Sequence, residues 1–416
     1  MEVTQEEKGF EIDTSDLDAE LKKPPATRSV INLVDILLNK AYEAGTSDIH
    51  LDPEEKALRA RFRIDGILQD VYRFPKEVHN EIITRIKVLS GLRTDEHQAT
   101  QDGRLRFKGK DEKFVDVRVA IAPTYYGENS VMRLLSDHSG NFDLKTLGFS
   151  DLNLSRIHEA IQKPHGLILT TGPTGSGKTT TLYMILKELN KPEISIVTIE
   201  DPIEYSLPGV DQIQVNTRTG LLFSTGLRSI LRQDPNIVMV GEIRDGETAN
   251  IAVNAAMTGH LVLSTLHTND SAVTIPRLLD LGVEPFLIAT TVNIAIAQRL
   301  VRTICPDCKV KRVLSEAEIE SLKKSIPPEL IGDNKIFYKG EGCARCGTTG
   351  YKGRVGIHEV LVVDEVIRDL IMKRANADEI RKASIAQGMK TMLVDGIEKA
   401  IKGMTTIEEV LRVFHE

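Results

Sequence analysis

The sequence predicts an α/β fold: a parallel sheet covered by helices, preceded by a smaller α+β domain and followed by a cysteine-containing insertion and a helical C-terminal region. Between residues 152 and 302, short apolar runs alternate with helical patterns, which is typical of parallel strands buried on both faces. Residues 29–136 instead alternate apolar and polar side chains, which indicates half-buried strands. A chain of 416 residues also exceeds what one core usually organises, so several domains are expected.

The domain boundaries follow from these changes of pattern. An arm is predicted at the start because acids are frequent there, large apolar residues are few, and Pro24-Pro25 interrupts the chain. The expected parts are an acidic flexible arm or linker (1–28), the α+β domain (29–136), an interdomain linker (137–151), the parallel-sheet domain (152–302), the cysteine-containing subdomain (303–358) and the helical region (359–416).

Local patterns predict the elements in order. The segment "ALRARFRIDG" alternates apolar residues with arginines and turns at Asp65-Gly66, which predicts a hairpin strand. A helix carrying Ile82 and Ile86 should end at Gly91, and "KFVDVRVAI" predicts a second alternating strand. The parallel strands are expected at "LILTT", "ISIVTIE", "NIVMVGE" and "LVLSTLH".

The most apolar segment, "PFLIATTVNIAIAQRLV", is expected to be helical. Thr290, Thr291, Asn293 and Gln298 interrupt it, so it falls short of the ~20 clean apolar residues of a membrane span. The acidic N-terminus lacks the basic flank and apolar stretch of a signal peptide. A soluble, cytoplasmic protein is expected.

Composition argues against nucleic acid as the main partner. The net charge is −7 and the calculated pI about 5.9, and no long run of Lys or Arg stands out. Aromatic residues make up 5% of the chain and Trp is absent, so stacking platforms for bases are not expected.

The segment "LILTTGPTGSGKTTTLYMILKELN" matches G-x-x-x-x-G-K-T through Gly172, Gly177, Lys178 and Thr179, between a strand and a helix. Glycines let successive backbone N–H groups converge on phosphate oxygens, and the helix N-terminus adds a positive dipole end. We expect Lys178 to reach the β and γ phosphates and the Thr179 hydroxyl to bind Mg²⁺. The alternative is a glycine-rich turn with nothing bound.

Two acidic sites end predicted strands. "IVMVGEIRD" leads to Glu242, and "IVTIEDPIE" delivers Glu200 and Asp201. The carboxyl edge of a parallel sheet is where ligands of such folds bind, so these carboxylates are expected beside the phosphate loop. Either acid alone could instead be a cap or turn residue.

Cys305, Cys308, Cys343 and Cys346 form two C-x₂-C pairs separated by 34 residues and are the only cysteines. Two such knuckles predict a closed, structural Zn²⁺ site with four thiolates. Disulfides and unrelated thiols are the alternatives, the first disfavoured in a reducing compartment. Because the insertion has little obvious core of its own, zinc is expected to order it.

Five motifs in order resemble the secretion ATPase superfamily of type II secretion and type IV pilus assembly, the GspE/PilB group. They are "GPTGSGKTT", "TIEDPIEY", "LRQDPNIVMVGEIRD", "TGHLVLSTLHTN", and "CPDC" with "CARC" before "GYKGRVGIHE". The resemblance runs from about Ser29 to the end. Asn236 departs from the family, which has Asp at that position, but it leaves Glu242 in place.

The resemblance implies a hexameric ring ATPase with a RecA-like core and a smaller PAS-like domain. Glu242 would act as catalytic base, while Glu200 and Asp201 help position Mg²⁺ and water. Arg118, Arg133 and Arg354 match the positions from which the family supplies arginines to the γ-phosphate, and an arginine finger is worth roughly 10³ to 10⁵ in rate. The insertion is typical of assembly ATPases rather than retraction ATPases of the family.

The residues themselves support these roles unequally. Arg118 lies on the polar side of its strand, where a solvated arginine is equally plausible. Arg133 shares a strand face with Val131 and Leu135, so we expect a buried guanidinium that needs an anion. His267 leaves its strand toward the nucleotide and can sense the γ-phosphate, whereas His260 could equally be a core histidine.

The predicted catalytic residues are therefore Glu242, Glu200, Asp201, Arg118, Arg133, Arg354 and His267. The predicted nucleotide-binding residues are Gly172, Pro173, Thr174, Gly175, Ser176, Gly177, Lys178, Thr179, Thr180, Arg228, Arg232, Arg244 and His260. Arg228 and Arg232 lie four residues apart on one helical face and Arg244 follows Glu242; ordinary ion pairing is the alternative for all three.

The expected function is an ATPase that drives type IV pilus assembly through an inner-membrane platform protein, with a type II secretion ATPase as the alternative. "TVNIAIAQRL" and "FYKGEGCARCGTTGYKGR" favour the pilus proteins slightly. A RecA-like nucleic-acid motor and a nucleotide-gated scaffold are the rivals from other classes. The expected partners are further copies of the chain, the platform protein and a cytoplasmic recruitment protein. The expected ligands are ATP, Mg²⁺ and Zn²⁺. The protein is expected to associate peripherally with the inner membrane.

Overall fold

The computed structural model describes residues 12–135, 143–322, 326–331 and 335–415. Two units divide the chain. The N-terminal unit contains the chain up to residue 140 with residues 304–310 and 339–353, and the C-terminal unit contains the remainder. Among the described residues, no helix is both long and apolar enough to span a bilayer.

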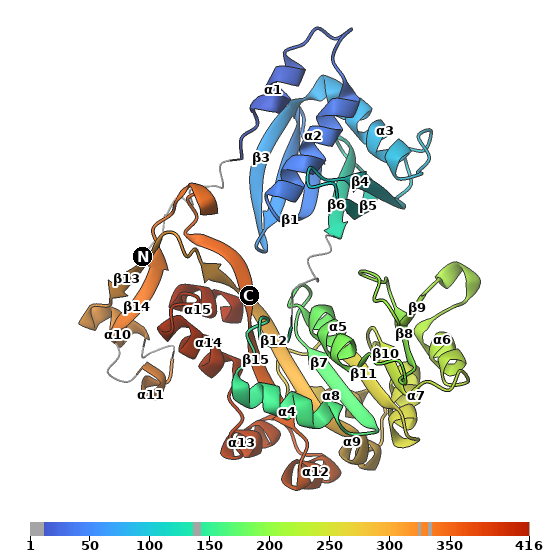
Figure 1. Ribbon diagram of the computed structural model, residues 1–416, viewed down its shortest axis with the longest axis vertical. Helices are drawn as coiled ribbons and strands as arrows, with labels where there is room; N and C mark the ends of the chain where they lie inside the picture. Colours follow the sequence, from blue (N-terminus) through green and yellow to red (C-terminus); the bar gives the residue numbers. More distant parts are fainter. Residues whose placement is uncertain (1–11, 136–142, 323–325, 332–334, 416) are drawn as a thin grey trace. The chain divides into compact units, whose positions relative to one another are not determined.

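An antiparallel sheet of the order β3-β2-β1-β6-β5-β4 forms the N-terminal unit (Figure 1). In β2, Leu58, Ala60 and Phe62 are fully buried while the arginines between them face the other side, as the alternation predicts. The elements are α1 (Ser15–Leu21), α2 (Val30–Glu43), β1 (Thr46–Pro53), β2 (Ala57–Ile64), β3 (Ile67–Pro75), η1 (Lys76–Val78), α3 (His79–Leu89), β4 (Gln101–Lys108), β5 (Phe114–Thr124) and β6 (Gly127–Leu135).

The prediction of a flexible arm over residues 1–28 is wrong for its second half. Helix α1 packs into the core of the N-terminal unit through Leu17, which is 1% exposed. Glu20 accepts a hydrogen bond from the backbone N–H of Ser29 at 2.8 Å, so it caps the start of α2. A short helix with two apolar residues that contact the core, Leu17 and Leu21, can therefore fold onto it despite its acidic composition. Residues 1–11, and residues 137–142 of the predicted linker, lie outside the described part of the chain.

The C-terminal unit contains a seven-stranded sheet of the order β15-β12-β7-β11-β10-β8-β9, in which neighbours from β12 to β9 pair in parallel. Its strands are β7 (Gly166–Thr171), β8 (Ile196–Glu200), β9 (Asp211–Gln214), β10 (Ile237–Val240), β11 (Leu261–Leu266), β12 (Val292–Ile304) and β15 (Tyr351–Val362). Its helices are α4 (Asp151–Ile161), α5 (Lys178–Leu189), η3 (Thr217–Thr219), α6 (Phe223–Ile230), α7 (Gly246–Met257), α8 (Thr274–Asp280), α9 (Pro285–Thr291), α12 (Glu365–Met372), α13 (Ala377–Ala386), α14 (Met392–Ile401) and α15 (Ile407–His415).

The two faces of this sheet bury separate cores, as the apolar strands predict. Ile168 of β7 shares a core with Leu182 of α5 on one face. Its neighbours Leu167 and Leu169 point the other way and share a core with residues of α7 such as Val253. Successive side chains of a strand alternate between faces, so a strand buried on both faces must be apolar throughout.

The segment 285–301 is not one helix, which corrects the expectation from its composition. Helix α9 ends at Thr291, and the chain continues as β12 between β7 and β15. A strand buried on both faces and a buried helix are both continuously apolar, so periodicity does not separate them.

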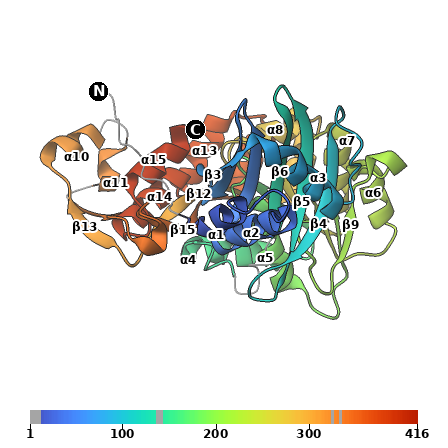
Figure 2. The ribbon, with the colours of Figure 1, turned by 90° about the horizontal axis from the view of Figure 1, so that it is seen from above.

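The insertion between the cysteine pairs buries its apolar residues in a core that it shares with the C-terminal helices. Leu314, Ile319 and Phe337 are buried together with Ile397 of α14 and Val410 of α15. Helices α14 and α15 lie side by side in both views (Figures 1 and 2). The predicted boundaries at 302/303 and 358/359 also fall inside strands β12 and β15. The remaining elements are β13 (Lys309–Val313), α10 (Glu316–Leu322), α11 (Pro328–Ile331), β14 (Ile336–Gly340) and η4 (Ala344–Cys346).

Candidate active site

The phosphate loop joins the end of β7 to the start of α5, at the carboxyl edge of the parallel sheet. Gly177 has a φ of 88° and directly precedes the helix, a conformation that favours glycine. A Cβ at Gly172 would lie 2.4 Å from the backbone oxygen of Gln298, so the loop could not pass this close to β12 with a larger residue. The ammonium of Lys178 donates to the carbonyls of Gly172 and Pro173 at 2.8 and 3.0 Å.

Glu242 stands just beyond β10 with three basic side chains around it. His267 lies 3.1 Å from one carboxylate oxygen through Nε2, and Arg244 lies 2.5 Å from the other. Burial lowers the pKa of Lys178, and the negative charge of Glu242 opposes this effect. The structure therefore places Arg244 and His267 against Glu242, whose charge acts on Lys178. For Arg244 this contact is the ordinary ion pair that the sequence left open as the alternative.

The two acids at the end of β8, Glu200 and Asp201, lie in different environments. Glu200 is 2% exposed and accepts hydrogen bonds from Tyr183 of α5, from Thr198 at 2.6 Å and from Gln212 at 3.1 Å. Burial raises its pKa despite these donors. Its neighbour Asp201 is exposed, and its charge acts on Arg244, whose pKa is raised first by the hydrogen bond to Glu242. Glu200 thus ties α5 to β8, while Asp201 faces solvent.

Arg228 forms an exposed ion pair with Glu247 at 2.6 Å, and Arg232, just past the end of α6, donates to the Arg228 carbonyl at 2.9 Å. Arg228 therefore forms an ordinary ion pair in this structure, which is the alternative to a nucleotide-binding role.

His260 is not placed at the nucleotide site of its own chain, which corrects its prediction as a binding residue. It precedes β11, whose first residue pairs with Gly166 and whose last pairs with Thr171. Because the strands are parallel, His260 lies at the edge of the sheet opposite to the phosphate loop, about 20 Å from His267 at 3.3 Å per residue. Its Nδ1 lies 3.0 Å from the Ala255 carbonyl.

The arginines taken from the resemblance lie in both units. Arg118 and Arg133 face each other across β5 and β6 in the N-terminal unit, and Arg354 is an exposed residue of β15 in the C-terminal unit. The expectation that Arg133 is buried is wrong: its side chain is 55% exposed and its Nε donates to the carboxylate of Asp48 at 2.8 Å. The residues beside it, Met132 and Leu134, carry the buried face of β6 instead.

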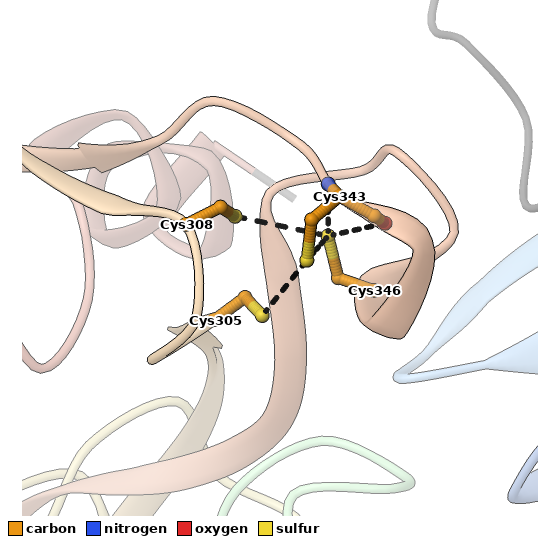
Figure 3. A group of neighbouring side chains, drawn as sticks. All are labelled: Cys305, Cys308, Cys343 and Cys346. Carbon is orange, nitrogen blue, oxygen red and sulfur yellow. Dashed lines mark hydrogen bonds between the residues drawn. The ribbon is translucent and has the colours of Figure 1, made fainter.

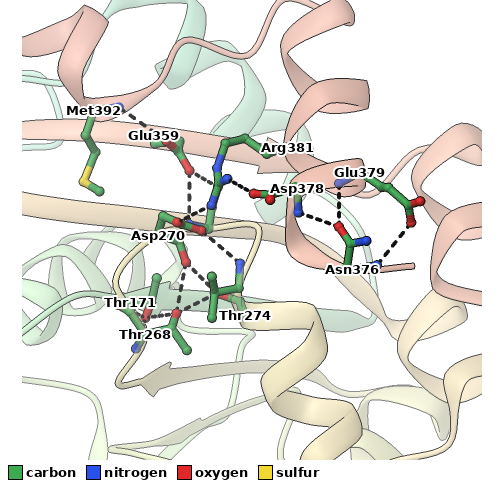
Figure 4. A network of polar contacts seen from close by, with 12 residues as sticks. Thr171, Thr268, Asp270, Thr274, Glu359, Asn376, Asp378, Glu379, Arg381 and Met392 are labelled. Atoms are coloured by element: carbon green, nitrogen blue, oxygen red, sulfur yellow. Dashed lines mark hydrogen bonds and ion pairs between the residues drawn. The ribbon is translucent and has the colours of Figure 1, made fainter. Parts of the chain in front are cut away.

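A polar network behind the phosphate loop was not predicted (Figure 4). Thr171, the last residue of β7, donates to the Thr268 carbonyl at 3.0 Å and accepts from the Thr268 N–H at 2.8 Å. Two residues on, the carboxylate of Asp270 accepts from Arg381 of α13 at 2.7 Å. The segment after His267 is therefore held between β7 and a C-terminal helix. Its threonines and Asp270 carry no spacing signal, so only the fold shows the connection.

The four cysteine sulfurs converge on one point (Figure 3). Sγ–Sγ distances are 3.8 Å for Cys305–Cys343, 3.9 Å for Cys308–Cys346 and 3.8 Å for Cys343–Cys346. A tetrahedral Zn²⁺ site with bonds of ~2.3 Å requires sulfurs about 3.8 Å apart, whereas a disulfide requires ~2.05 Å. Although burial raises the pKa of Cys346, backbone N–H groups of Cys343 and Gly350 lower it to about 7. The donor set fits a structural zinc ion.

Comparison with known proteins gives consistent matches over nearly the whole chain. Residues 25–412 match the family described as type II/IV secretion system protein. The chain is 47% identical over 389 residues to type II secretion system protein E of Aeromonas hydrophila, covering 93% of this chain and 76% of that protein. It is 44% identical over 413 residues to the type IV pilus assembly ATPase PilB of Myxococcus xanthus, covering 99% and 71%. The pilus retraction motor PilT with bound ADP has a similar structure, with a TM-score of 0.61 at 26% identity over 91% of this chain and 96% of that one.

Proposed function

Because the chain belongs to the type II/IV secretion system protein family, we propose that this ATPase couples ATP hydrolysis to the assembly of a type IV pilus. One observation carries the enzymatic part of the proposal: the side chains of Lys178, Glu242, Arg244 and His267 meet beside a phosphate loop at the carboxyl edge of the sheet. Phosphoryl transfer needs cations on the phosphates and a base for the attacking water, and this group contains both.

The roles follow from the contacts. Lys178 exchanges its two loop carbonyls for the β and γ phosphates. Glu242 accepts the proton of the attacking water, while Arg244 and His267 hold its carboxylate in place. Mg²⁺ would neutralise charge on the phosphates when bound, and the half-exposed Thr179 in the first turn of α5 and the exposed Asp201 are the residues that would hold it. Glu200 contributes by joining β8 to α5 through Tyr183.

The mechanical part of the proposal rests on the family. We infer a homohexameric ring that acts on an inner-membrane platform protein, with Arg118, Arg133 and Arg354 completing the positive charge around the γ-phosphate. Four clustered cysteines support a structural zinc ion in each chain. The match to a type II secretion protein at 47% identity also supports a second candidate function, the ATPase of a type II secretion system.

Steady-state ATP hydrolysis of Glu242→Gln tests the enzymatic proposal. We expect kcat to fall by about 10² to 10⁴ because the general base is lost, while affinity for a fluorescent ADP analogue changes little. Glu188→Gln is the matched control, since Glu188 of α5 also lies 3.1 Å from a histidine, His158, but on the surface. If Glu242→Gln hydrolysed ATP at the wild-type rate, Glu242 would not be the base.

Complementation separates the two machines. Expression in a strain without its pilus assembly ATPase should restore surface pili, while expression in a strain without its type II secretion ATPase should not restore export of a reporter enzyme. The reverse pattern would favour the secretion function.

A further inference from the structure

We propose that Gln298 is a positioning residue that braces the phosphate loop in the conformation that binds nucleotide; the proposal rests on the ATPase function above. Gln298 lies on β12, next to β7, and is 2% exposed. Its neighbour Ala297 pairs with Thr171, the last residue of β7. The side chain of Gln298 is therefore level with the start of the loop.

The carboxamide of Gln298 contacts both sides of the turn into α5. Its Nε2 donates to the backbone carbonyl of Ser176 at 2.7 Å, and its Oε1 accepts from the hydroxyl of Thr181 at 2.8 Å. These two partners flank Gly177, the left-handed residue that opens the helix. The backbone oxygen of Gln298 also lies so close to Gly172 that a side chain at that position would clash with it. One residue of a neighbouring strand thus contacts the loop at its beginning, its end and its helix.

This arrangement bears on nucleotide binding through the direction of the peptide groups. A loop that turns its N–H groups toward phosphate must turn its carbonyls away, and a buried carbonyl needs a donor. Gln298 is that donor for Ser176. If the peptide between Ser176 and Gly177 rotated, its carbonyl would face the phosphates and repel them. The hydrogen bond therefore stabilises the orientation that binds anions.

The side chain of Gln298, which we call the brace, contacts no reacting atom. Its loss should therefore change the affinity for nucleotide rather than the rate of the chemical step. Two neutral and nearly isosteric variants test this. Gln298→Met removes both hydrogen bonds of the brace. Asn293→Leu is the matched control, because Asn293 is a second buried carboxamide of β12 that donates to the His165 carbonyl at 3.2 Å, at the opposite edge of the sheet.

The affinity of each full-length variant for methylanthraniloyl-ADP is measured by fluorescence anisotropy, and KM and kcat for ATP are measured in parallel. For Gln298→Met we expect Kd and KM to rise about 10-fold, the change expected for the loss of one to two hydrogen bonds, with kcat within about 3-fold of wild type. Asn293→Leu should keep the wild-type Kd. Amide hydrogen exchange in the loop should be faster in Gln298→Met before nucleotide is added.

Wild-type affinity in Gln298→Met would overturn the proposal, and so would an equal loss in Asn293→Leu, because that would reflect general loosening of the core. If Gln298→Met did not fold, Thr181→Val would replace it: this variant removes one of the two hydrogen bonds and should weaken binding about 3-fold. An unchanged Kd for that variant would also overturn the brace. Binding is measured without hydrolysis, so an inactive wild-type protein would contradict the proposed function, whereas unchanged affinity in Gln298→Met contradicts the brace alone.

Discussion

Glu409 provides the sharpest test of how the C-terminal helices are held. This residue of α15 has a side chain only 3% exposed and accepts from Arg302 of β12 at 2.6 Å. It also accepts two hydrogen bonds from Arg412 at 2.9 Å, one to each carboxylate oxygen. Burial alone would raise the pKa of Glu409, but the hydrogen bonds from Arg412 and Arg302 outweigh it and lower the pKa to about 2.

The size of the effect follows from this pKa. A fall from the ordinary value of 4.5 to about 2, at about 1.36 kcal/mol per pH unit, corresponds to about 3 kcal/mol of stability at neutral pH. A carboxylate whose pKa is depressed on folding contributes fully above its unfolded pKa, and the contribution is lost as pH falls toward the folded pKa. Linkage therefore predicts that Glu409 still contributes about 2 kcal/mol of stability at pH 3.5.

The perturbation is Glu409→Gln, which keeps the shape and removes the charge. At pH 7 we expect the Tm of the C-terminal unit to fall by about 6 to 12 °C, at about 2 to 4 °C per kcal/mol. Differential scanning calorimetry and far-UV circular dichroism are suitable, since the chain has no Trp for fluorescence. Glu408→Gln is the control, because its ion pair with Arg312 is exposed and should contribute little.

The pH dependence decides the interpretation. The Tm difference between wild type and Glu409→Gln should narrow between pH 4.5 and pH 3.5. Equal Tm values at pH 7, or a difference that stays the same down to pH 3.5, would refute the assignment of this stability to the charged carboxylate.

Two further predictions concern the metal site and the network behind the loop. Metal analysis of freshly purified protein should find about one zinc per chain, because four sulfurs form a single tetrahedral site, and Cys343→Ser should lower that content. A wild-type protein without zinc would contradict the site. A double-mutant cycle of Asp270→Asn and Arg381→Gln should give a coupling of up to about 1 kcal/mol in unfolding free energy, since the pair is partly exposed. Additive effects would show that this ion pair does not stabilise the contact with α13.

The parts of the site that the sequence determined are encoded by local spacing. The glycines, Lys178 and Thr179 lie within one strand–loop–helix unit. The local structure of that unit does not depend on the order of the strands in the sheet. Glu242 is predictable as a candidate because it directly follows an apolar strand. The four cysteines are predictable as a metal site because two C-x₂-C pairs have few other uses in a chain without further cysteines.

Other features depended on which strands are neighbours. The sequence places His267 at the exit of its strand but leaves two roles open for His260, and only the parallel pairing of β11 puts His260 at the opposite edge of the sheet. Glu200 looked equivalent to Glu242, but Tyr183 and Gln212 enclose its carboxylate once α5 and β9 pack beside β8. The exposure of Arg133 likewise depends on which face of β6 the helices cover.

Gln298 shows most clearly the difference between what local sequence predicts and what the tertiary structure decides. In the sequence it is one of four polar residues that interrupt an apolar run, 122 positions away from Ser176. Only the placement of β12 beside β7 turns it into a donor for the phosphate loop. A motif carries its own backbone geometry, but the hydrogen-bond partners of its buried groups come from whichever strand the sheet places next to it, because contacts across a sheet have no counterpart in sequence spacing.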